Sequence, residues 1–175
     1  EFFETVLNWN KDHPTARFTG LQFDLEPSSG STTEQHRVFL EGVYATMQTM
    51  RGFTVDGTEN IENQELTVAM FCDPRWGGTV CATAWGQVVS QLDVVEIEHY
   101  RWGGASFAEG IDYSLAYTAN ALAVVINQGR YFTCTLSCDE LPKTIEASDP
   151  YGSRFNMGRE GYEQAMEDYA DYYNA

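Results

Sequence analysis

Residues 18–27 read Phe-Thr-Gly-Leu-Gln-Phe-Asp-Leu-Glu-Pro, and this stretch predicts a strand that ends in carboxylates. Apolar and polar residues alternate along it with the two-residue period of a β-strand. Pro27 ends the strand because its ring nitrogen cannot donate to a ladder. Polar side chains in line on a strand covered on both faces are costly unless a site uses them. We therefore expect a functional site to include the polar series, Gln22, Asp24 and Glu26.

Three further apolar stretches predict strands, and helical patterns separate them. Strands that alternate with helices form a parallel sheet with right-handed crossovers. The sequence therefore predicts an α/β fold with four parallel strands and helices on the outside. No Gly-x-Gly-x-x-Gly opens a helix, so a dinucleotide-binding fold has no support. The predicted strands lie near residues 18–26, 65–72, 93–100 and 130–138, and the predicted helices near 1–11, 33–52, 82–92, 106–128 and 159–173.

The first strand resembles the active-site strand of chitinase-like (family eighteen) glycoside hydrolases. That motif runs hydrophobic, Asp, Gly, hydrophobic, Asp, hydrophobic, Asp, any residue, Glu. Thr19 and Gln22 stand where the family has its first two acids. The Asp-x-Glu-Pro ending also resembles related, uncharacterised glycosidase-like barrels. The residues that match the motif are Phe18, Gly20, Leu21, Phe23, Asp24 and Glu26.

The resemblance implies a parallel (β/α) barrel of TIM type, of which these would be strands four to seven. Residues 1–175 would form a single partial domain that lacks counterparts of the first three strands and the last one, since a complete barrel needs about 250 residues. Four strands cannot close, so we expect another chain segment or a second subunit to complete the barrel. A self-sufficient open α/β sheet is the alternative.

The resemblance also implies roles for individual residues. Glu26 matches the general acid, which must deliver a proton to the leaving oxygen, and Asp24 matches the residue that orients the substrate's acetamide. Tyr100, at the end of the third strand, stands where the family has a Tyr that holds the same group. These three are the predicted catalytic residues. The predicted substrate-binding residues are Gln22, Glu98, Arg101, Trp102 and Trp76, the tryptophans by stacking on sugar rings.

Two structural alternatives stand beside these assignments. The carboxylates of the first strand could line a polar barrel core without acting on a substrate. The third strand, which carries Glu96, Glu98 and Tyr100 on one face, could be an exposed edge with solvated glutamates. Each tryptophan could equally be buried in the core.

The composition of the chain limits the classes of binding partner and indicates a cellular compartment. The formal net charge is −16, which disfavours nucleic acid because phosphate binding needs a basic surface. No apolar run is long enough for a membrane span. The cysteines form no Cys-x-x-Cys pair and the histidines are scattered, so neither a metal nor a cofactor is expected. Two disulfides, Cys72–Cys81 and Cys134–Cys138, are predicted for an exported protein, with four buried thiols as the alternative.

Two functions are therefore expected from the sequence. The first is an extracellular or secretory glycoside hydrolase that acts on a polysaccharide, with Glu26 as the acid. The second is a non-catalytic extracellular protein that binds carbohydrate, or serves a structural role, and retains a degenerate glycosidase barrel. Replacement of two family acids by Thr19 and Gln22 favours the second, and fold alone does not establish activity.

Overall fold

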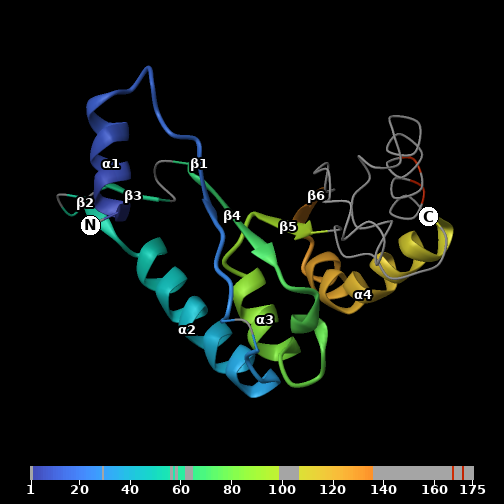
Figure 1. Ribbon diagram of the computed structural model, residues 1–175. Coiled ribbons are helices and arrows are strands. Elements are labelled where there is room, and N and C mark those ends of the chain that lie inside the picture. Colours follow the sequence, from blue (N-terminus) through green and yellow to red (C-terminus); the bar gives the residue numbers. More distant parts are fainter. Residues whose placement is uncertain are drawn as a thin grey trace, which may run out of the picture.

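The computed structural model of this 175-residue chain describes residues 2–28, 30–55, 57, 59–61, 65–98, 107–135, 167 and 171. Strands and helices alternate along these residues (Figure 1). In order the elements are α1 (Phe2–Asp12), β1 (Gly20–Phe23), α2 (Thr33–Arg51), β2 (Thr54–Val55), β3 (Glu59–Asn60), β4 (Thr67–Cys72), the 3-10 helix η1 (Pro74–Gly77), α3 (Ala82–Val89), β5 (Val94–Glu98), α4 (Phe107–Asn127) and β6 (Tyr131–Thr135).

The main sheet has four strands in the order β1-β4-β5-β6, and all neighbours are parallel. The predicted α/β fold with a parallel sheet is therefore confirmed, and each of its strands overlaps a predicted one. β1 is shorter than predicted, because it ends at Phe23 and leaves Asp24 and Glu26 beyond the ladder. β2 and β3 form a separate antiparallel pair in a segment where the sequence predicted no strand. The predicted helix at 159–173 lies almost wholly outside the described residues.

The hydrophobic core lies on one side of the sheet, between the strands and the helices. Each strand joins the same edge of the sheet in chain order, so right-handed crossovers place α2, α3 and α4 on one side. Figure 1 shows these helices in a row, with α3 between α2 and α4. Side chains that face them are buried, and β4 shows the alternation most clearly, since Val68, Met70 and Cys72 are buried while Ala69 and Phe71 are not.

The opposite side of the sheet is more polar and more exposed. Strand register places one set of side chains there, and we call this surface the Gln22 face. Gln22 and Thr133 are exposed, and Tyr131 retains 80% of its accessible surface. Among the residues whose side chains the structure describes, the Gln22 face consists of Gln22, Thr67, Ala69, Phe71, Val94, Glu96, Tyr131 and Thr133.

The helical layer closes around two tryptophans. Trp76 of η1 is 1% exposed, and its Nε1 donates to His36 Nδ1 over 3.0 Å. Trp85 of α3 lies 5.1 Å from Trp76, ring centre to ring centre, and donates through Nε1 to the carbonyl of Ala121 in α4. Next to Trp76, Gly77 brings η1 directly against the α4 backbone, which leaves no room for a side chain. This contact fixes α4 to the loop that follows β4.

The predicted disulfide between Cys72 and Cys81 is wrong. Both thiols are buried and unbridged, and each donates to a backbone carbonyl, that of Asp73 for Cys72 and that of Thr33 for Cys81. Burial raises the pKa of the Cys81 thiol, because a thiolate is poorly solvated there. The pairing of Cys134 with Cys138 falls outside the side chains that the structure describes.

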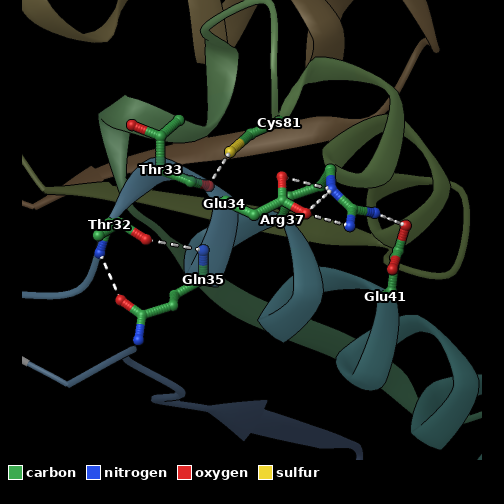
Figure 2. A network of polar contacts seen from close by, with 7 residues as sticks. All are labelled: Thr32, Thr33, Glu34, Gln35, Arg37, Glu41 and Cys81. Carbon is green, nitrogen blue, oxygen red and sulfur yellow. Dashed lines mark hydrogen bonds and ion pairs between the residues drawn. The ribbon is translucent and has the colours of Figure 1, made fainter.

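Local signals set the two segments that flank β1. Asn10 of α1 is buried, and its side chain both donates to the carbonyl of Phe18 and accepts from the Phe18 N–H, which ties α1 to the approach to β1. Beyond the strand, Thr32 and Gln35 form a reciprocal capping box that starts α2 (Figure 2). Thr32 is therefore the N-cap residue of α2.

Candidate functional site

The site lies on the Gln22 face, where a side-chain hydrogen bond joins β1 to β5 across β4. Gln22 Nε2 donates a hydrogen bond of 2.9 Å to Glu96 Oε2. The two strands are separated by β4, and so by roughly 10 Å. Ala69 of β4 is in register with Gln22, whereas Phe71 of β4 is in register with Glu96, so the hydrogen bond crosses β4 diagonally.

Glu96 has an altered affinity for protons. Its side chain is half-buried on the Gln22 face, and burial raises the pKa of its carboxyl because the charged form loses solvation. The negative charge of Asp24 raises the pKa of Glu96 further. Asp24 and Glu96 therefore interact electrostatically, although Asp24 follows β1 and Glu96 belongs to β5, which is not paired with β1. Glu96 holds a proton more readily than an ordinary glutamate.

Asp24 and Glu26 lie just past the C-terminal end of β1 and are exposed. All four strands of the sheet run parallel, so their C-terminal ends share one edge. Active sites of parallel α/β proteins lie at this edge, because the loops that follow the strands meet there. Glu98 is the last residue of β5, so its backbone belongs to the same edge. Tyr100, Arg101 and Trp102 lie outside the described residues.

Trp76 is not part of this site. The sequence predicted that its ring stacks on sugar, but the ring is 1% exposed and packs against Trp85 and Phe39 within the helical layer. Its single donor is used by His36. No face of the indole is open to a ligand, so this substrate-binding assignment is wrong.

Glu96 belongs to the site but was not among the site residues predicted from the sequence. Its parity with Glu98 placed it on the same face, but its position in the middle of a strand gave it no special weight. The available signal was a polar residue within each of two predicted strands, Gln22 on one and Glu96 on the other, offset by two residues in register. Gln22 and Glu96 can meet because β4 pairs with both β1 and β5 and sets their register, and the sequence alone does not reveal that register.

The described residues contain no group of three or more His, Cys, Asp and Glu side chains that could hold a metal ion. None of the helices in these residues combines the length and the apolar character that a bilayer crossing requires. No family model, curated protein or solved structure matches the chain.

Proposed function

We propose that the chain is a glycosidase-like protein that acts on or binds a polysaccharide along the Gln22 face, with Glu26 as the general acid. The observation that carries the proposal is the gathering of carboxyl groups at one edge of a parallel sheet. Asp24 and Glu26 are exposed where β1 ends, and Asp24 is close enough to Glu96 to raise its pKa. A carboxyl group whose proton affinity is raised by burial and by a neighbouring carboxylate, as that of Glu96 is, is typical of acid–base sites.

The strand order supports a barrel as the setting. A doubly wound sheet reverses its strand order at the ligand site, whereas a (β/α) barrel adds every strand in the same direction. The order β1-β4-β5-β6 shows no reversal. We propose that these strands form part of a TIM-type barrel whose interior is the Gln22 face, completed by another segment or subunit. An extracellular location belongs to the same proposal, because chitin and cellulose, the polysaccharides tested below, lie outside the cell.

In this proposal Glu26 protonates the glycosidic oxygen as the bond to the leaving sugar breaks. Asp24, two residues earlier, orients the substrate, as the chitinase-like motif implies. Gln22 and Glu96 form a fixed hydrogen-bonded pair beside them and offer polar atoms to sugar hydroxyls. Glu98, Tyr100, Arg101 and Trp102 would extend the site from the end of β5.

The test is sugar release by wild-type protein and by Glu26→Gln, with soluble chitin and cellulose fragments as substrates. The amide keeps the shape of the side chain but cannot deliver the proton, so hydrolysis should fall by about 10²–10⁴-fold while binding persists. Glu4→Gln is the matched control, because Glu4 is an exposed glutamate in α1. Equal hydrolysis by wild type and Glu26→Gln would remove Glu26 from this role.

A non-catalytic carbohydrate-binding protein is the second candidate. It is favoured by Gln22, which replaces a family acid and whose amide is already engaged by Glu96. In that case wild-type protein releases no sugar but is retained on insoluble polysaccharide. Retention should then weaken with Asp24→Ala and remain unchanged with Glu4→Gln. If neither sugar release by Glu26→Gln nor retention of Asp24→Ala falls below that of wild type, both candidates are contradicted.

A further inference from the structure

We propose that the outer edge of β1 is a docking site for an extended peptide segment whose apolar side chains alternate with basic ones. This edge is also where the next strand of the proposed barrel would pair, so the segment described here would take the place of that strand. Three features of the described residues define it, namely the backbone groups of the edge, an apolar groove beside it, and the charge of the neighbouring face.

The edge of β1 offers backbone hydrogen-bonding groups. β1 ends the strand order, so within the described residues it is paired on one side only, with β4. Thr67 N donates to the carbonyl of Thr19, and Gly20 is in register with Thr67. In a parallel ladder with this pattern, the N–H and C=O of Leu21 point toward β4, and those of Gly20 and Gln22 point away. Such an edge is a template for one more strand.

An apolar groove of about 440 Å³ lies beside this edge, between α1, the end of β1 and α2. Phe23, which lines it, shares the register of the buried residue Met70, so the groove is on the helix side of the sheet. Side chains of an added strand would alternate between the two sides, and every second one would enter the groove. Its lining residues are Phe3, Phe23, Leu25, Val38, Phe39, Gly42, Val43, Thr46, Met47 and Met50.

The negative charge of the Gln22 face determines which kind of segment can dock at this edge. The remaining side chains of an added strand would lie over the Gln22 face, beside Gln22 and Asp24, with Glu96 two strands farther on. Opposite charges on neighbouring strands attract and like charges repel. Basic residues at these positions are therefore favoured. A second copy of this chain, with a net charge of −16, is disfavoured as the occupant.

The probe is a short, labelled peptide of alternating valine and lysine, and binding is measured by fluorescence anisotropy. A block peptide with the same composition, all valines before all lysines, controls for charge and hydrophobicity. We expect the alternating peptide to bind and the block peptide to bind at least about tenfold more weakly, because only the alternating order places valines in the groove and lysines on the Gln22 face. Equal binding of the two peptides, or no binding of either, would overturn the proposal.

Two pairs of variants locate the contact. Gln22→Pro and Gln22→Ala both remove the hydrogen bond to Glu96, but only proline also removes the outward N–H. The proline variant should bind about tenfold more weakly than the alanine variant, since the peptide carbonyl is left without its donor. Gly42 lines the groove with open space around its Cβ position, so Gly42→Leu should block binding and Gly42→Ala should not. Thermal melting checks that each variant is folded. Folded Gln22→Pro and Gly42→Leu proteins that bind like wild type would refute docking at this edge.

Discussion

Replacement of Gly77 by alanine tests the contact that joins η1 to α4. An added Cβ would lie 2.1 Å from Ala121 N, 2.3 Å from Asn120 C and 2.7 Å from Ala121 Cα, against 3.4–4 Å for an ordinary contact. All three atoms belong to the backbone, so no side chain can rotate away. The two elements must separate by more than about 1 Å, which would also disturb the Trp85–Ala121 hydrogen bond. We expect Gly77→Ala to lower the free energy of unfolding by at least ~3 kcal/mol, the upper range of overpacking costs.

Gly42→Ala is the matched control for this prediction. Gly42 lies inside α2, and a Cβ there meets nothing within 4 Å. Alanine should stabilise the helix by about 0.5–1 kcal/mol, because it restricts the unfolded chain more than glycine does. Urea titration followed by tryptophan fluorescence measures both variants. If Gly77→Ala unfolds within about 0.5 kcal/mol of wild type, the difference that surface substitutions give, the close approach of η1 and α4 is refuted.

Two further predictions concern α2. Burial, with a smaller effect from the charge of Arg75, lowers the pKa of His36 below its usual 6.5, so the folded state resists protonation that the unfolded state accepts. The free energy of unfolding should therefore be unaffected by His36 above about pH 7 and should fall as the pH drops below 6.5. His36→Gln should remove that part of the slope, and parallel stability–pH curves for the two proteins would contradict it. Thr32→Ala should cost about 1 kcal/mol through loss of the capping box, measured by urea unfolding, whereas Thr46→Ala on the exposed side of α2 should have a smaller effect.

Much of the fold could be predicted because its signals are local. The alternation in residues 18–26, the apolar run ending at Cys72 and the glycine at position 129 each act within a few residues, and the strands and helices appear where these signals place them. The β2–β3 pair was missed because its strands have two residues each, too few for a period to show. The error in β1 has the same origin, since alternation continues through Asp24 and Glu26 although the ladder ends at Phe23.

The site was harder to predict because it depends on which side of the sheet receives the helices. The sequence showed that Gln22, Asp24 and Glu26 share a face, but it could not show that Glu96 completes the group. Trp76 shows most clearly what the sequence alone could not predict. A tryptophan in a loop after a strand can face a ligand or the core, and here the partner that turns it inward is His36, 40 positions away in the sequence.

The order of the strands also has a consequence for how the chain is assembled. Every pairing in the main sheet joins strands that are consecutive among its members, so each new strand closes a loop no longer than one crossover. The entropic cost of such closures grows only slowly with loop length. During synthesis, β4 can therefore dock on β1, and β5 on β4, before the later strands have left the ribosome. The sheet can grow as the chain is made, one strand and one helix at a time.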